Sequence, residues 1–187
     1  MCFLIKQIIP IFTIMFTNKI IPKLFFLIAL SFLPYQSYGQ FLSVDFGVNG
    51  LTCSACTRSV EMSIRKLNFV EDIVMNLKNT NGKITFNKDA VVSIDKIAKA
   101  ITDAGFSVRY LNATFLFDSI TISDNYCFAY ENSNYQFINV GTKKLQGNTV
   151  LKFIGKQFLP KKEYKKLNVY IKPLCETGKQ KTYYVKL

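Results

Sequence analysis

The sequence predicts an α+β protein, in which a βαββαβ sandwich is followed by a small antiparallel β-rich domain. Three observations support this prediction. Hydrophobic residues within 40–112 switch between the two-residue period of strands and the three-to-four-residue period of helices. Residues 113–187 instead contain short runs rich in Phe, Tyr, Ile and Val, separated by turn residues. The charge also shifts, since the first range holds nine basic and seven acidic side chains and the second twelve lysines and five acidic side chains. We place the boundary near Asn112–Thr114.

Residues 1–39 have the pattern of a secretory signal peptide. Two lysines precede an apolar run over residues 24–33, Pro34 ends the run, and small residues precede a predicted cleavage site after Gly39. The run is shorter than the roughly 20 residues that a membrane-spanning helix needs. We therefore expect an exported protein of the periplasm or cell envelope. An uncleaved N-terminal anchor is the alternative, and Met15 is an alternative start.

The elements of the 40–112 domain follow from hydrophobic spacing. Leu42, Val44, Phe46 and Val48 alternate with polar or small residues, as in a half-buried strand. The expected elements are a strand at 42–48, a helix at 56–67, strands at 73–77 and 84–86 joined by an Asn-Gly hairpin at 79–82, a helix at 94–104 between an N-cap at Ser93 and a terminating Gly105, and a strand from Val108. This βαββαβ order predicts a ferredoxin-like sandwich with both helices on one face of the sheet.

The 113–187 domain has only strand-like runs. They lie at 116–122, 126–130, 135–140, 150–153, 168–171 and 182–185. Glycine and proline punctuate these runs, which indicates a small antiparallel sandwich or barrel. The pattern does not specify the strand order.

Cys53-Ser54-Ala55-Cys56 lies between the first strand and the first turn of a helix. A helix N-terminus stabilises negative charge, so we expect these thiols to be readily available as thiolates. Two thiolates suit Cu(I), which accepts two sulfur ligands, or another thiophilic ion such as Hg(II). Zinc usually takes four ligands, and the chain has no histidine and no acidic residue or further cysteine near the pair.

The segments Gly50–Cys56 and Ile101–Phe106 together resemble the heavy-metal-associated domain family. That family includes copper chaperones, the metal-binding domains of P-type ATPases and periplasmic mercuric-ion-binding proteins, and the resemblance covers about residues 41–111. It implies that Cys53 and Cys56 are the metal ligands and that Phe106 packs near the metal loop. Leu51 departs from the family motif, which normally has Met; we expect Leu51 to serve as an apolar core residue beneath the loop.

A binding protein is the predicted function. The absence of histidine excludes Ser-His-Asp and Cys-His catalysis, and no carboxylates cluster, so we expect no enzyme activity and no catalytic residues. We predict an exported protein that captures Cu(I) and passes it to a membrane metal transporter or another metal-accepting protein, without binding nucleic acid. The alternatives are a periplasmic Hg(II)-binding protein and a structural or interaction protein of the envelope whose cysteine pair is oxidised or vestigial.

Two further features lie in residues 113–187. Cys127 and Cys175 are expected on strands and predicted to form a disulfide worth roughly 3–4 kcal/mol, with a second metal site as the alternative. Lysine pairs occur at 143–144, 161–162 and 165–166. A solvated face is the main interpretation of these pairs, and docking to an anionic membrane surface or an acidic partner is the alternative.

Overall fold

The computed structural model describes residues 39–175 and 180–187, all within one compact unit, Tyr38–Leu187. The predicted signal peptide, apart from Gly39, and the alternative start at Met15 lie outside the described residues. Within the described part of the chain, no helix is long and apolar enough to cross a membrane.

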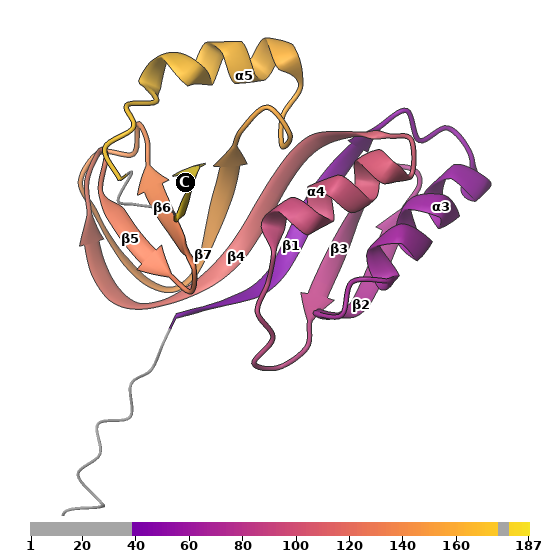
Figure 1. Ribbon diagram of the computed structural model, residues 1–187, viewed down its shortest axis with the longest axis horizontal. Helices are drawn as coiled ribbons and strands as arrows, with labels where there is room; N and C mark the ends of the chain where they lie inside the picture. Colours follow the sequence, from indigo (N-terminus) through magenta and orange to yellow (C-terminus); the bar gives the residue numbers. More distant parts are fainter. Residues whose placement is uncertain (1–38, 176–179) are drawn as a thin grey trace, which may run out of the picture. The chain divides into compact units, whose positions relative to one another are not determined.

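The fold is built on one eight-stranded sheet with the strand order β2-β3-β1-β4-β7-β8-β6-β5 (Figure 1). The elements are β1 (Gln40–Asn49), α3 (Ser54–Arg65), β2 (Val70–Asn76), β3 (Asn81–Phe86), α4 (Ile94–Asp103), β4 (Ser107–Ile122), β5 (Cys127–Tyr130), β6 (Ser133–Phe137), β7 (Lys143–Ile154), α5 (Lys161–Leu167), the 3-10 turn η1 (Asn168–Tyr170) and β8 (Lys181–Lys186). The chain is therefore α+β, as predicted.

The first four strands form a ferredoxin-like arrangement. They lie in the order β2-β3-β1-β4, and each strand is antiparallel to its neighbours. Helices α3 and α4 both cover the same face of these strands (Figure 1). The Ser63 hydroxyl of α3 donates a 2.8 Å hydrogen bond to the Ala100 carbonyl of α4 and links the two helices. The predicted βαββαβ sandwich is confirmed.

Hydrophobic periodicity determines which side of each element is buried. Phe46 of β1, Ile64 of α3 and Ile101 of α4 are fully buried and belong to one core cluster. Burying such a side chain contributes roughly 1.5–3 kcal/mol, so this cluster fixes the helices on the sheet. Ser93 is the N-cap residue of α4 but makes no side-chain capping bond. Gly105 follows the helix with φ +90°, a conformation that glycine adopts without strain.

The predicted domain boundary falls inside a strand. Asn112 pairs with Asp45 on β1 and with Lys152 on β7, and Ala113 is fully buried. β4 therefore serves both halves of one sheet, and no linker separates them. The change in composition marks a change in what the strand packs against, from helices before residue 113 to aromatic side chains after it. The expected separate β-rich domain is corrected to an extension of the same sheet.

The extension has an aromatic core and a mixed strand arrangement. β6 pairs with β8 in parallel, so the expected purely antiparallel arrangement is also corrected. Rings from β4, β5, β6 and β8 meet in offset and edge-to-face contacts, among them Phe115, Phe117, Phe128, Tyr135 and Tyr183. Phe128 packs against the core cluster that includes the other four rings and the buried faces of α3 and α4.

The strand predicted at 168–171 is wrong. Residues 168–170 form the turn η1 instead, directly after α5. Tyr164, Leu167 and Ile171 are spaced by three and four residues, a helical period that places all three against a small apolar cluster. Val169 suggested a strand but is exposed, because it lies on the opposite side of this turn.

Asp95 joins the first half of the fold to the extension. Its carboxylate accepts hydrogen bonds from the Tyr183 hydroxyl at 2.9 Å and the Gln157 amide at 3.3 Å, and it pairs with the Lys181 ammonium. Burial, aided by the hydrogen bond to Asp95, raises the pKa of the Tyr183 hydroxyl. This cluster ties the start of α4 to β8 and to the loop after β7.

Candidate metal centre

The loop between β1 and α3 carries the predicted ligands. β1 ends at Asn49, and Gly50 then adopts φ +87°, which a residue with a side chain rarely adopts. Leu51 follows and is only 4% exposed. This confirms that Leu51 is a core residue beneath the loop. Cys53 and Cys56 come next, exposed and half-buried respectively.

Cys53 is the N-cap residue of α3. Its backbone is extended, and its Sγ accepts a hydrogen bond from the Cys56 N–H at 3.2 Å. The Cys53 carbonyl also accepts hydrogen bonds from the Thr57 N–H at 3.1 Å and the Thr57 hydroxyl at 3.2 Å. Sulfur therefore accepts from a backbone amide at a helix N-terminus, where negative charge is stabilised. The first turn of α3 contains no acidic residue to oppose that effect.

The two sulfurs of this loop are joined as a disulfide in the structure. The Cα atoms of Cys53 and Cys56 lie 5.2 Å apart. Reduction would leave two thiols of one loop within reach of a single ion. Within residues 39–175 and 180–187, no cluster of three or more His, Cys, Asp or Glu side chains is suited to hold a metal. The donor set thus fits a soft ion that accepts two sulfur ligands and does not fit a four-ligand zinc site.

Phe106 lies next to the cysteine loop, as predicted. A methyl group placed on Gly50 would meet the Phe106 ring at 3.7 Å. On the same side, the Asn49 amide donates to the Ser107 hydroxyl at 3.4 Å. Sequence analysis did not identify Ser107 or Thr57 as residues that hold the loop. The sequence did contain a signal for Thr57, which lies four residues after Cys53. A hydroxyl one turn into a helix can donate to the carbonyl of the N-cap residue.

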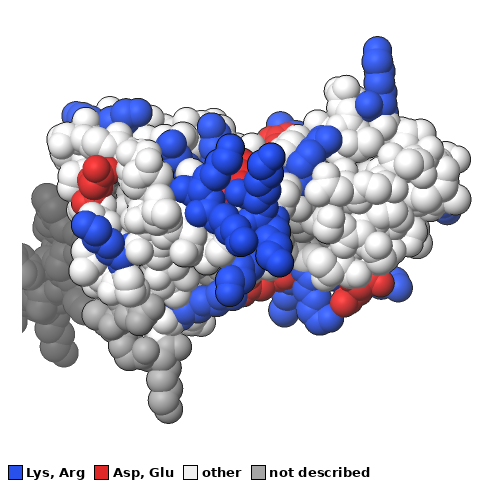
Figure 2. Space-filling view, turned by 90° about the horizontal axis from the view of Figure 1, so that it is seen from above, with Lys and Arg blue, Asp and Glu red and all other residues white. Residues whose placement is uncertain are grey.

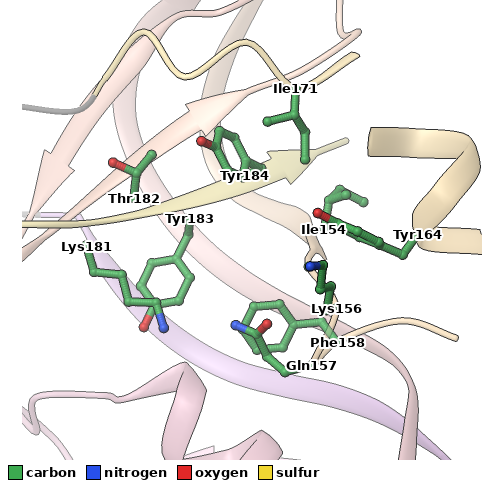
Figure 3. A pocket seen from close by; sticks show the side chains of 11 residues that line it. Ile154, Lys156, Gln157, Phe158, Tyr164, Ile171, Lys181, Thr182, Tyr183 and Tyr184 are labelled. Carbon is green, nitrogen blue, oxygen red and sulfur yellow. The ribbon is translucent and has the colours of Figure 1, made fainter. Parts of the chain in front are cut away.

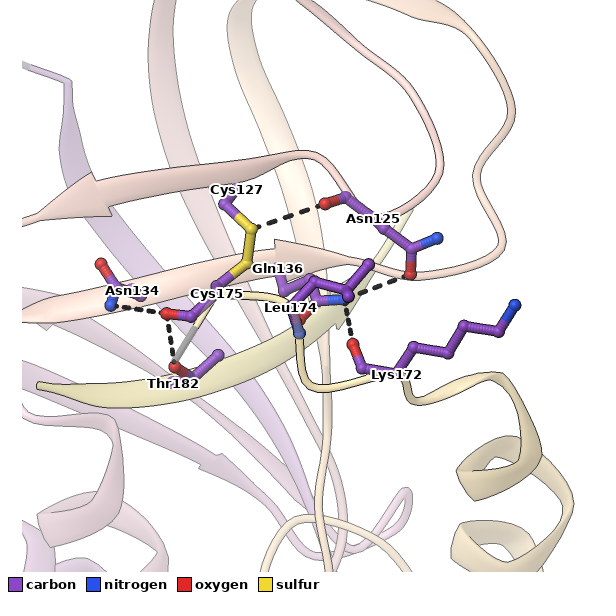
Figure 4. Close-up of a disulfide and its surroundings, with 8 residues drawn as sticks. All are labelled: Asn125, Cys127, Asn134, Gln136, Lys172, Leu174, Cys175 and Thr182. Carbon is purple, nitrogen blue, oxygen red and sulfur yellow. Dashed lines mark hydrogen bonds between the residues drawn. A yellow bond between two sulfur atoms is a disulfide. The ribbon is translucent and has the colours of Figure 1, made fainter. Parts of the chain in front are cut away.

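The second cysteine pair is a disulfide, as predicted, between an exposed and a buried cysteine (Figure 4). Cys127 of β5 and Cys175 have Cα atoms 5.9 Å apart, and Cys175 is 4% exposed. The Cys175 carbonyl accepts hydrogen bonds from the Asn134 amide at 3.1 Å and the Thr182 hydroxyl at 3.4 Å. Cys175 precedes β8 and is not on a strand, contrary to expectation. Because the bond is made and Cys175 is buried, the alternative of a second metal site at this pair is not supported.

A separate pocket of about 220 Å³ lies beside β8 and α5 (Figure 3). Tyr164, Ile171 and Tyr184 line one part of it, and Phe158 and Tyr183 line another. Its lining contains no cysteine and no carboxylate. The pocket is therefore unsuited to a soft metal ion.

Comparison with known proteins agrees with this assignment. The model of the heavy-metal-associated domain matches residues 45–107. The mercuric transport protein periplasmic component of Serratia marcescens is 32% identical over 84 residues, which are 45% of this chain and 91% of that protein. The cation-transporting ATPase HMA5 of Oryza sativa subsp. japonica is 34% identical over 73 residues, and a copper-transporting ATPase of Helicobacter pylori is 37% identical over 65 residues.

The extent of these matches differs between the relatives. They cover 39% and 35% of this chain, but only 7% of the Oryza ATPase and 9% of the Helicobacter ATPase. The similarity to the ATPases is thus confined to one small domain of each. The match to the Serratia protein spans nearly that whole protein. The match of the domain model, residues 45–107, includes the cysteine loop and both helices. The chain belongs to the heavy-metal-associated domain family.

Proposed function

We propose that this protein is a non-catalytic carrier that captures Cu(I) through Cys53 and Cys56 and passes it to a second thiol-bearing protein, such as a membrane metal transporter. The observation that carries the proposal is the pair of sulfurs at the accessible N-terminus of α3, without a third clustered ligand in the described residues. Two-coordinate sulfur favours Cu(I) over zinc. The copper-transporting ATPase relative supports the same ion.

Capture begins with the reduced pair. An incoming dithiol gives two electrons and two protons to the Cys53–Cys56 disulfide, whose S–S bond breaks, while the dithiol itself becomes a disulfide. Cu(I) then displaces the thiol protons and binds both sulfurs. Because Cys53 is exposed, a thiolate of the recipient can approach the ion and form a three-coordinate intermediate before one of the original sulfurs leaves. The half-buried Cys56 anchors the loop on the core during this exchange.

We place this activity outside the cytoplasm. The Cys127–Cys175 disulfide is of the kind that persists in oxidising compartments. The Serratia relative is named as a periplasmic component. The apolar run and cleavage pattern of residues 1–39 agree with export.

An anaerobic Cu(I) titration of the reduced Tyr38–Leu187 unit against a chromophoric chelator tests the proposal. We expect a single tightly held ion per chain. The Cys53→Ser, Cys56→Ser double variant should lose it, whereas a Cys127→Ser, Cys175→Ser variant, which removes the same number of sulfurs, should retain it. Equal binding by the wild type and the first variant would exclude Cys53 and Cys56 as the ligands.

Hg(II) is the second candidate ion, and the relative named for mercuric transport supports it. The same titration with Hg(II) and a small competing thiol separates the two ions. Retention of Cu(I) against its competitor, with loss of Hg(II) to the thiol, supports the copper assignment. The opposite result would replace copper by mercury.

The disulfide in the structure favours a third interpretation, in which the pair stays oxidised and the protein serves as an interaction module of the envelope. Thiol labelling of the protein isolated without reductant tests it. Free thiols at Cys53 and Cys56 support the carrier, and a complete disulfide that dithiols fail to reduce would support the interaction module.

A further inference from the structure

We propose that residues 156–174 form a docking surface for an anionic phospholipid bilayer. We call this the α5–η1 surface; it comprises the loop after β7, α5, η1 and the segment that leads to Cys175. The inference goes beyond metal capture and does not depend on it, because the surface shares no residue with the cysteine loop.

The surface is strongly basic. Residues 156–174 contain six lysines and one acidic residue, Glu163. All six lysines are exposed: Lys156, Lys161, Lys162, Lys165, Lys166 and Lys172. None of them forms an ion pair with a residue of the described ranges. Figure 2 looks onto the side of the molecule that carries α5 and shows Lys and Arg side chains gathered in a band across it. Such a cluster attracts anionic headgroups.

Apolar side chains are exposed on the same surface. Val169 is 72% exposed, Tyr170 47% and Leu174 63%. α5 and η1 contain no fully buried residue, whereas α3 and α4 each bury several. Lysines beside exposed aliphatic and tyrosine side chains are typical of segments that lie at a membrane surface, where the apolar groups enter the boundary between headgroups and acyl chains.

The underside of the surface is fixed to the sheet. Tyr164, Leu167 and Ile171 pack against a small cluster formed by Ile138, Ile154 and Leu159. These contacts use one side of the segment, and the lysines and the exposed apolar residues occupy the remainder.

Two further links fix the end of the segment (Figure 4). The fully buried Gln136 donates from Nε2 to the Lys172 carbonyl at 2.6 Å, and its Oε1 accepts from the Leu174 N–H at 3.3 Å. The disulfide to Cys127 holds the next residue, Cys175. Docking therefore requires little ordering of the backbone, which lowers its entropic cost.

The exposed apolar residues favour a bilayer over an acidic protein. Lysines alone would suit either partner. Val169 and Tyr170 on η1, and Leu174 after it, are exposed and do not line the pocket beside β8 and α5 or the two pockets that border α5. A bilayer accommodates protruding apolar groups without a complementary pocket.

Vesicle flotation of the Tyr38–Leu187 unit tests the proposal. This unit lacks the apolar run of residues 24–33, so that run cannot cause binding. The vesicles contain either phosphatidylcholine alone or a mixture with phosphatidylglycerol. We expect binding to the mixture only, and a loss of about tenfold or more when NaCl rises from about 0.05 M to about 0.5 M.

Two variants with a matched control localise the binding. Replacing Lys161, Lys162, Lys165 and Lys166 by Gln should weaken binding to the mixed vesicles by about tenfold or more. The control variant replaces Lys66, Lys78, Lys88 and Lys96, all exposed and outside this surface, by Gln and should bind nearly as the wild type does. A Val169→Ser, Tyr170→Ser, Leu174→Ser variant should weaken binding at high salt. Circular dichroism and Cu(I) binding check that each variant is folded.

Three results would overturn the proposal. Equal losses in the two lysine variants would show attraction by net charge instead of a localised surface. If the serine variant binds at high salt as the wild type does, the exposed apolar side chains do not contribute to binding. Binding to immobilised polyglutamate, without binding to either kind of vesicle, would reassign the surface to an acidic protein partner.

Discussion

Cys53 and Cys56 lie three residues apart at the N-terminus of α3, whereas Cys127 and Cys175 lie 48 residues apart and join β5 to the segment before β8. The first pair is exposed or half-buried, and the sulfur of its leading cysteine caps a helix. In the second pair, Cys127 is exposed, but Cys175 is buried and its carbonyl accepts two side-chain hydrogen bonds. One cysteine pair thus forms an accessible candidate site in the first half of the sheet, and the other forms a covalent link in the extension.

The difference arises from access and loop length. A disulfide exchanges with a thiol when the attacking thiolate reaches one sulfur and the other sulfur leaves as a thiolate. In the second pair Cys127 is exposed, but attack there must expel the thiolate of the buried Cys175, and a buried thiolate is poorly solvated. A disulfide restricts the unfolded chain more when the loop it closes is longer. The Cys53–Cys56 pair is therefore suited to change state within the folded protein. The Cys127–Cys175 pair is suited to stay closed.

Selective reduction is the largest effect expected from this contrast. A limiting amount of dithiol added to the folded protein should open Cys53–Cys56 about tenfold or more faster than Cys127–Cys175. Alkylation followed by peptide mass spectrometry reads out both pairs in one sample. In urea the two rates should become similar, because Cys175 is then accessible. Equal rates in the folded protein would contradict the proposed division of roles.

For stability, the Cys127–Cys175 disulfide should matter more than the Cys53–Cys56 disulfide. Replacing Cys127 and Cys175 by Ser should lower the free energy of unfolding by about 4 kcal/mol, since the bond closes a long loop. Replacing Cys53 and Cys56 by Ser should lower it by about half of that or less. Urea unfolding without reductant measures both losses. A larger loss in the Cys53/Cys56 variant would show that this disulfide also has a structural role.

Sequence reasoning succeeded where a local period and a local motif determine the structure. The alternation through β1 and the stripes of α3 and α4 predicted the first half of the fold, and the Cys53-to-Cys56 spacing identified the candidate site. Leu51 was correctly assigned to the core because its volume resembles that of the expected methionine. Each of these features depends on neighbours within one or two turns of the chain.

The extension depends on contacts that are distant in the sequence. The parallel pairing of β6 with β8 joins Tyr135 to Tyr183, and no local signal specifies that partner. The continuous strand β4 was divided because a change in charge resembled a domain boundary. The helical spacing of Tyr164, Leu167 and Ile171 was present but obscured by the β-branched Val169. The hydrogen bond from Tyr183 to Asp95 spans 88 residues and becomes visible only in the folded chain.

The smallest expected effect is a loss of stability at low pH, and it arises in the extension and not at the cysteine loop. The Asp124 carboxylate, close to Cys127, accepts hydrogen bonds from the backbone N–H groups of Gly141 at 3.0 Å and Val140 at 2.6 Å. These bonds lower the pKa of Asp124 below its ordinary value. The folded state therefore holds its proton less tightly than the unfolded state does. The resulting stabilisation is present above the ordinary Asp pKa of about 3.9 and is lost as pH falls through the lower, folded value.

An Asp124→Asn variant isolates this contribution. Its free energy of unfolding should lie below that of the wild type near neutral pH, and the difference should shrink as pH falls below about 4. Urea unfolding at a series of pH values measures the difference. Cu(I) affinity of the reduced variant at neutral pH should equal that of the wild type, because the carboxylate lies in the extension and α3 carries the cysteine loop. A difference in stability that stays constant down to the lowest pH would show that the amide disturbs the turn at Val140–Gly141 by its shape, independently of charge.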